Sequence, residues 1–195
     1  APSRGLGDVY KRQQYGLSEG YTPLRDTMKK YLEKKEGFDF ENNELFIVSG
    51  GQQCADLTTK ALVNEGDVVL TEEPAFVGCL NTFRSYGAKL VGIPMEQDGM
   101  NINALEEALK ANPDAKLLYT IPSFQNPTGI TTSLEKRKKV YELCCKYDIA
   151  ILEDNPYGEL RFAGENVPTI KSMDTEGRVI YAGSFLKVMP PAFRL

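Results

Sequence analysis

Residues 149–154 read Ile-Ala-Ile-Leu-Glu-Asp, a short apolar run that ends in two acidic side chains. The run lacks the alternation of a strand with one solvated face, so it predicts a strand that is covered on both faces. A carboxylate such as Asp154 at the end of a buried strand is costly unless it is paired, which implies a cationic partner. The stretch therefore predicts a parallel sheet with a charged group at one edge.

Similar apolar runs recur through the chain, with helical patterns between them. The predicted strands are residues 45–49, 67–71, 88–93, 115–120, 149–153 and 178–182. The predicted helices are residues 23–36, 52–64, 77–86, 104–111 and 133–147, with Thr22 placed to cap the first and Gly37 to end it. Because strands and helices alternate, the expected fold is α/β, a mostly parallel sheet with right-handed crossovers and helices on both faces.

Composition excludes several classes of function. The chain has 195 residues, no histidine, 27 acidic and 23 basic side chains, and a net charge of −4. The lack of histidine excludes Ser-His-Asp and Cys-His nucleophile pairs and histidine-ligated metals, and we expect no metal site. A mildly acidic chain without a long basic run is a poor partner for nucleic acid or an anionic membrane. No stretch is long and apolar enough to span a bilayer and no signal peptide precedes the chain, so a cytoplasmic location is expected.

The cysteines point to the same compartment. Cys54, Cys79, Cys144 and Cys145 form no CxxC pair, and two of them are neighbours in sequence. We therefore expect reduced thiols rather than a zinc site or a disulfide framework.

Loops that follow the predicted strands are the candidates for chemistry, because ligands of α/β sheets sit beyond the carboxyl ends of the strands. Five loops stand out, at residues 49–53, 72–76, 122–129, 153–158 and 183–187, the last followed by Arg194. The glycines of the first loop open a helix, where unpaired N–H groups suit a phosphate, although a plain tight turn gives the same pattern. It is not a P-loop, because no Gly-Lys-Ser/Thr follows.

Residues in the other loops also have plain structural interpretations. Phe76 suits stacking on a flat ring, but an aromatic residue that opens a helix equally suits the core. Asn126 lies in ordinary turn chemistry, yet two prolines in its loop would hold the amide rigidly. A lone lysine such as Lys187 is usually a solvated surface group. Its place at the same sheet edge as Asp154 favours a functional role.

Taken together and in order, these segments resemble the fold-type I pyridoxal 5′-phosphate (PLP) enzymes, specifically the class I and II aminotransferases near the 2-aminoadipate and kynurenine branch. The resemblance covers about residues 14–195. It rests on YG at 15–16, GYTPLR at 20–25, SGGQQ at 49–53, EEPAF at 72–76, NPTG at 126–129, EDNPYGELRF at 153–162 and GSFLK at 183–187. Each motif alone is modest, whereas the set in the family's order and spacing is specific.

The resemblance implies a role for each site residue. Lys187 would form the Schiff base with the cofactor and later move the substrate α-proton, while Asp154 would pair with the pyridinium nitrogen. With Tyr157 these are the implied catalytic residues. Asn126 and Tyr157 would hydrogen-bond the phenolic oxygen of the ring, and Phe76 would stack on its face. The implied phosphate ligands are the backbone of Gly51 and Gln52, the side chains of Ser184 and Arg194, and Tyr15 acting on the neighbouring subunit.

Some positions depart from the family pattern. Leu186 stands where the family usually has a second serine before the active lysine, and Gly51 stands where a serine is common. The segment Pro-Pro-Ala-Phe at 190–193 is an unusual version of the family's Ala-Pro-Gly-Leu. These changes predict weaker phosphate binding, not a different family.

The resemblance implies an aminotransferase that moves an amino group from an amino acid to a 2-oxo acid by a ping-pong Schiff-base mechanism, as a homodimer. Residues 5–13 (GLGDVYKRQ) resemble translated adapter sequence, so residues 1–13 are expected to be a non-native N-terminus. Residues 14–195 are expected to form the PLP-binding large domain without its C-terminal small domain, a fragment that is inactive alone. The alternatives are the effector domain of a GntR/MocR-type regulator, a PLP-dependent β-lyase or cyclopropane-carboxylate synthase, and a non-catalytic interaction domain.

Overall fold

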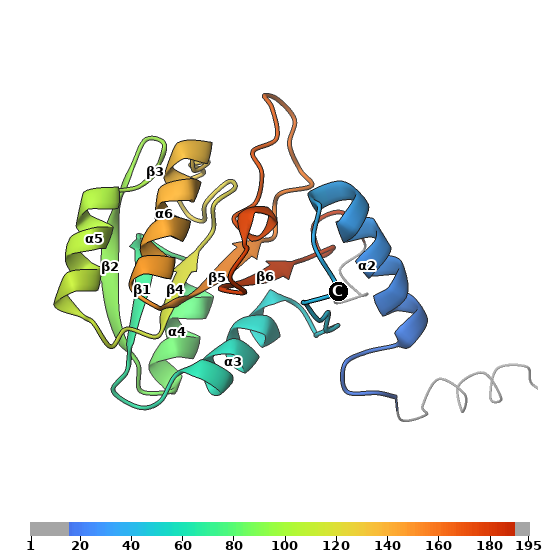
Figure 1. The fold of residues 1–195 in the computed structure, drawn as a ribbon, viewed down its shortest axis with the longest axis horizontal. Helices are drawn as coiled ribbons and strands as arrows, with labels where there is room; N and C mark the ends of the chain where they lie inside the picture. The colour runs from blue at the N-terminus through green and yellow to red at the C-terminus, as the bar shows by residue number, and fades with distance from the viewer. Residues whose placement is uncertain (1–15, 190–195) are drawn as a thin grey trace, which may run out of the picture.

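The computed structural model describes residues 16–189 (Figure 1). Its helices are Thr22–Glu36 (α2), Gly51–Leu62 (α3), Val77–Ser85 (α4), Ile102–Ala111 (α5) and Leu134–Lys146 (α6), with a 3-10 turn at Lys171–Met173 (η1). Its strands are Val68–Glu73 (β1), Lys89–Glu96 (β2), Gly99–Met100 (β3), Leu117–Thr120 (β4), Ala150–Asn155 (β5) and Val179–Gly183 (β6). The short β3 and η1 were not predicted from the sequence.

The strands form one sheet in the order β3-β2-β1-β4-β5-β6. All neighbouring pairs are parallel except β2 with the short β3. The expected mostly parallel sheet is confirmed. The chain adds β2 on one side of β1 and then returns to add β4 on the other side. The order of the strands therefore reverses between β1 and β4, and in such sheets the carboxyl ends of the strands at this switch point frame a ligand site.

Helices cover both faces of the sheet, as predicted. Leu70, Leu118 and Ile151 pack in one buried cluster with residues of α5 and α6. Their strand neighbours Val69 and Leu117 pack in a second cluster with residues of α3 and α4. Successive strand residues thus point to opposite faces and both are buried, which explains why the strands read as continuous apolar runs. Figure 1 shows α5 and α6 on one side of the sheet and α3 and α4 on the other.

The prediction of a first strand at residues 45–49 is wrong. These residues form no strand, and none of the described strands pairs with them. The apolar composition of Leu-Phe-Ile-Val favours an extended backbone, but a strand also requires a neighbour that completes its hydrogen-bond ladder. The segment instead lies across a cavity from β6, which is the last strand of the sheet, and α2 forms another wall of that cavity.

The sequence predicts both ends of α2 to within one residue. Gly37 ends the helix as expected, with a φ of 71° that favours glycine, and its N–H bonds the carbonyl of Glu33. The expected cap is displaced by one residue, because Tyr21 holds the N-cap position and Thr22 is already helical. Among residues 16–189, no helix is both long and apolar enough to cross a membrane.

Candidate functional site

The loops after β1, β4, β5 and β6 meet at the carboxyl edge of the sheet. The parallel register pairs Asp154 with Ala182 and Asn155 with Gly183, so β5 and β6 end side by side. Ser184 follows β6 directly and Lys187 comes three residues later, so the segment that carries both begins beside the end of β5. The structure thus brings the predicted aspartate and lysine loops to one edge, as the sequence analysis expected.

Asp154 is a carboxylate near the end of β5 that no cationic side chain of the described residues neutralises. Its Oδ2 accepts a hydrogen bond of 2.9 Å from the hydroxyl of Tyr119 on β4. No ion pair among residues 16–189 includes Asp154. Burial raises the pKa of Asp154 to about 6, and the Tyr119 hydrogen bond acts in the opposite direction. The cationic partner that the sequence implied is therefore not a side chain of the described residues.

The start of α3 lies against this carboxylate. Gly50 caps the helix with a φ of 81°, a conformation that favours glycine, and Gly51 is the first helical residue. A Cβ atom at Gly51 would lie 3.8 Å from Oδ1 of Asp154. The first turn carries no acidic side chain. A helix start of this kind attracts an anion through its free N–H groups and its dipole.

Tyr157 connects two of the predicted site residues. Its hydroxyl accepts a hydrogen bond of 3.4 Å from Nδ2 of Asn126. Nζ of Lys187 lies 6.0 Å from the centre of the Tyr157 ring. Asn126, Tyr157 and Lys187 come from the loops after β4, β5 and β6, so three separate loops converge here. The Asn126 amide and the Lys187 amine therefore both lie near Tyr157, so that one small ligand could contact all three side chains.

Gln52 and Phe76 hold neighbouring helix starts together. The Gln52 side chain donates to the carbonyl of Gly78 at 3.1 Å and to the hydroxyl of Thr82, which ties α3 to α4. Phe76 precedes α4 and is half-buried, packed against the cluster of apolar residues beneath α3 and α4. Its ring lies so close to Gly78 that a Cβ there would come within 2.6 Å of it. The Gln52 side chain is therefore engaged in hydrogen bonds to α4, which leaves its backbone as the group open to a phosphate.

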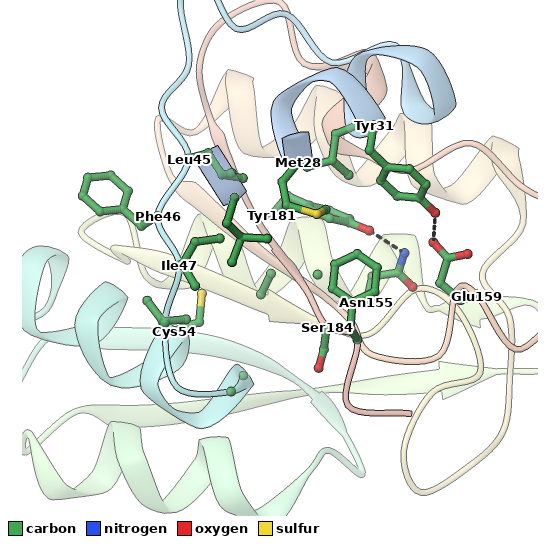
Figure 2. A pocket seen from close by; sticks show the side chains of 18 of the residues that line it. Met28, Tyr31, Leu45, Phe46, Ile47, Cys54, Asn155, Glu159, Tyr181 and Ser184 are labelled. Atoms are coloured by element: carbon green, nitrogen blue, oxygen red, sulfur yellow. Dashed lines mark hydrogen bonds between the residues drawn. The ribbon is translucent and has the colours of Figure 1, made fainter. Parts of the chain in front are cut away.

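A cavity of about 380 Å³ opens beside the start of α3 and the segment that follows β6 (Figure 2). Gly51 and Ser184, two of the predicted phosphate ligands, both line it. The other walls include apolar side chains of α2 and of residues 45–48, Tyr181 of β6, and the polar residues Asn155 and Glu159. Tyr31 of α2 donates to Glu159 at 2.9 Å, which joins α2 to the loop after β5. Tyr15 and Arg194, also predicted as phosphate ligands, lie outside the described residues.

The cysteines near the site are buried thiols with raised pKa values. All four are free, in agreement with the expected reduced thiols. Cys54 lines the cavity, and burial raises its pKa to about 11. Burial likewise raises the pKa of Cys79 to about 12. Both side chains are therefore protonated near neutral pH, when a thiol is a weak nucleophile.

Sequence reasoning missed Tyr119. Its ring is fully buried, packs edge-on against Phe83 and directs its hydroxyl to Asp154. One signal was present, because a buried tyrosine in an apolar strand needs a hydrogen-bond partner for its hydroxyl. Glu72 and Gln125 were also missed as individual residues, although both lie in loops that the sequence singled out.

We predict that Tyr119→Phe raises the pKa of Asp154. The hydroxyl stabilises the ionised carboxylate, and a hydrogen bond to a charged group contributes about 1.5–3 kcal/mol, or roughly one to two pKa units. An NMR titration of the Asp154 carboxyl would measure the shift. Tyr181→Phe is the matched control, because the hydroxyl of this half-buried residue accepts from Asn155 at 3.0 Å rather than bonding Asp154. An unchanged Asp154 pKa in Tyr119→Phe would show that the bond does not stabilise the charge.

Comparisons with known proteins agree with this arrangement. A family model described as aminotransferase class I and II matches residues 3–190. The aromatic-amino-acid aminotransferase 1 of Thermococcus litoralis is 42% identical over 186 residues, which span 93% of this chain and 45% of that protein. The crystal structure of Pyrococcus horikoshii kynurenine aminotransferase in complex with PMP has a TM-score of 0.90 and 40% identity, and the match covers 97% of this chain and 49% of that one.

Transcriptional regulators are also among the relatives. The probable rhizopine catabolism regulatory protein MocR of Rhizobium meliloti is 35% identical over 181 residues, which span 93% of this chain and 36% of that protein. The chain therefore spans about half the length, or less, of the proteins that it matches.

Proposed function

The chain belongs to the class I and II aminotransferase family, and from this premise we propose that it forms the PLP-binding part of an enzyme that moves an amino group from an amino acid to a 2-oxo acid. One observation carries the proposal. Asp154 lies at the carboxyl edge of the sheet without a cationic side chain among the described residues, next to the first turn of a helix. Asp154 has a single hydrogen bond within residues 16–189, so a cation would stabilise its charge, whereas a helix start favours an anion, and PLP carries both a cation and an anion on one ring.

The remaining residues fit the same cofactor. Asn126 and Tyr157 offer an amide and a phenol to a ring oxygen, and Lys187 offers an amine beside them. Ser184 and the backbone of Gly51 line the cavity at the phosphate end. We assign Gln52, through its backbone, and Phe76, through its ring, to the same site. Tyr15 and Arg194 complete the proposed set, with Tyr15 acting on the neighbouring subunit of a homodimer.

Each side chain has a defined task in this proposal. PLP, when bound, supplies an aldehyde that accepts an amine and a ring that accepts electrons. Asp154 keeps a proton on the ring nitrogen through its negative charge. Lys187 takes the α-proton of the substrate and returns a proton to the product, as a general base and then a general acid. Asn126 and Tyr157 would contact the ring and orient it relative to the Lys187 amine.

Transfer of labelled nitrogen tests the proposed activity. The full-length protein, supplied with PLP, an amino acid carrying isotope-labelled nitrogen and an unlabelled 2-oxo acid, is expected to place the label in the newly formed amino acid. A ping-pong mechanism predicts parallel lines in double-reciprocal plots of the two substrates. A protein that binds PLP but transfers no label from any of a broad panel of amino acids would contradict the enzymatic function.

A regulatory function is the second candidate, because the match to the MocR relative covers 93% of this chain. In that case the chain would sense an amino acid or PLP for a separate DNA-binding segment. The two functions differ in what accompanies this domain. We expect the full-length protein to transfer nitrogen and not to bind a promoter fragment. Specific, salt-resistant binding to DNA upstream of its own gene, without nitrogen transfer, would favour the regulator.

A further inference from the structure

Glu72 is a buried carboxylate near the end of β1, and only 1% of its surface is exposed. Its Oε1 accepts from the hydroxyl of Thr120 at 2.5 Å and from the N–H of Ile121 at 3.1 Å. Its Oε2 accepts from Nε2 of Gln125 at 3.0 Å. No ion pair among residues 16–189 includes Glu72, so within this range hydrogen bonds oppose the cost of burying it, although burial still raises its pKa. All three donors belong to β4 or to the loop that follows it.

Gln125 uses its full hydrogen-bonding capacity. Besides Glu72, its Nε2 donates to the carbonyl of Pro74 at 2.7 Å. Its Oε1 accepts from the N–H of Thr128 at 2.9 Å and from the Thr128 hydroxyl at 2.7 Å. A glutamine side chain offers two N–H donors and two oxygen lone pairs, and all four are paired here. The amide therefore has one favourable orientation, and Glu72 and Thr128 together determine it.

These hydrogen bonds link the end of β1 to the loop after β4 across the switch point of the sheet, and together they are called the bridge. Glu72 and Pro74 belong to the end of β1 and its loop, whereas Gln125 and Thr128 belong to the loop after β4. β1 and β4 are the adjacent strands between which the strand order reverses. Asn126 lies between the two anchored residues, Gln125 and Thr128. Its amide projects toward Tyr157, with the Nδ2 atom 3.4 Å from the hydroxyl.

We propose that Glu72 is a positioning residue, which holds Gln125 in one orientation and thereby fixes Asn126 for its contact with the bound cofactor. Glu72 itself touches no predicted ligand atom and acts only through the loop at residues 125–128. The hydrogen bonds define how Glu72 holds the loop, whereas its effect on the cofactor rests on the proposed function, in which Asn126 contacts the phenolic oxygen of PLP.

The substitution Glu72→Gln tests the bridge with little change in volume. A glutamine at position 72 must direct its NH₂ group either at Thr120 and Ile121 or at Gln125, and each of these already points a donor toward position 72. Rotating the Gln125 amide to accept would bring its own NH₂ group against the N–H of Thr128. Every arrangement therefore leaves one buried donor facing another, which is costly.

Glu153→Gln is the matched control. Glu153 is also a buried glutamate of the sheet with 1% of its surface exposed. Its carboxylate accepts from the N–H groups of Ile170 and Lys171, at 2.9 and 2.8 Å, and makes no bond to the loop of Asn126. The control therefore reproduces the loss of a buried carboxylate without disturbing the bridge.

Hydrogen exchange in the cofactor-free, full-length protein is the first readout. We expect the amides of Thr128 and Gly129 to exchange about tenfold faster in Glu72→Gln than in the parent, because one broken buried hydrogen bond costs roughly one tenfold step. In Glu153→Gln these amides should exchange at the parent rate. Equal rates in Glu72→Gln and the parent would overturn the proposal. So would an acceleration in Glu72→Gln that is uniform over the whole chain.

The second readout is the pH midpoint of the visible absorption of the PLP-loaded protein. A donor to the phenolic oxygen stabilises the deprotonated form of the Lys187-linked cofactor, so losing that donor should raise the midpoint. We expect Glu72→Gln and Asn126→Ala each to raise it, and Glu72→Gln to add little once Asn126 is alanine. Faster loop exchange with an unmoved midpoint would overturn the positioning role. A parent protein that takes up no PLP would refute the proposed function, and the exchange rates would still decide the bridge.

Discussion

Replacing Lys187 by alanine is expected to reduce nitrogen transfer by about a thousandfold while PLP still binds without a covalent bond. Lys187 supplies the only amine beside Asn126 and Tyr157 in the described part of the site. A positioned acid or base contributes roughly a hundredfold to ten-thousandfold to a rate, and this variant also removes the covalent anchor of the cofactor. The measurement is kcat with labelled amino acid at saturating PLP.

Lys138→Ala is the control for this experiment. Lys138 is an exposed residue of α6, a helix on the face of the sheet opposite to α3. Its replacement should leave kcat unchanged. Turnover by Lys187→Ala within tenfold of the parent would show that another group moves the proton.

Asp154→Asn is expected to slow proton abstraction by about a hundredfold to a thousandfold with a smaller change in KM. The asparagine keeps the shape of the side chain and can accept the Tyr119 hydrogen bond, but it lacks the charge that holds a proton on the ring nitrogen. Removing one group that stabilises developing charge typically has an effect of this size. An α-deuterated substrate would report the slowed step, because the isotope effect on kcat should increase.

Asp174→Asn separates this chemical effect from loss of structure. Asp174 forms an ion pair with Lys171 at 2.8 Å and accepts from the backbone of Arg178 and Val179 at 3.0 Å, so its replacement should lower the melting temperature and leave the isotope effect unchanged. If Asp154→Asn behaved in the same way, Asp154 would be a structural residue and not a partner of the cofactor.

The sequence predicted the layers of the fold because the strands are buried on both faces. Leu117 and Leu118 are neighbours in β4, yet each is fully buried in a different cluster. Such runs are apolar at every position, and this property is local and visible in the sequence. The segment at residues 45–49 has the same composition and forms no strand, because ladder formation depends on a partner that local sequence does not specify.

The sequence predicted which site residues lie together only where their positions follow from the pairing of the strands that they end or follow. Asp154 and Ser184 come together because β5 and β6 pair in parallel, and the alternation of strands and helices predicts that pairing. The bond from Tyr119 to Asp154 depends on which face each side chain takes and on the register of β4 with β5. The bond from Gln125 to Glu72 joins residues 53 positions apart through their rotamers. Contacts of this kind require the packed structure, so the sequence indicated the loops but not the bonds that hold them.

Peptide mapping after borohydride reduction tests the central claim most directly, namely that this sheet edge holds PLP through Lys187. The full-length protein would be loaded with PLP, reduced, digested and analysed by mass spectrometry. We expect the mass of the reduced cofactor on the peptide that contains Lys187, and its absence from the same peptide of the Lys187→Ala variant. A cofactor mass on any other lysine, or on none, would contradict the assignment.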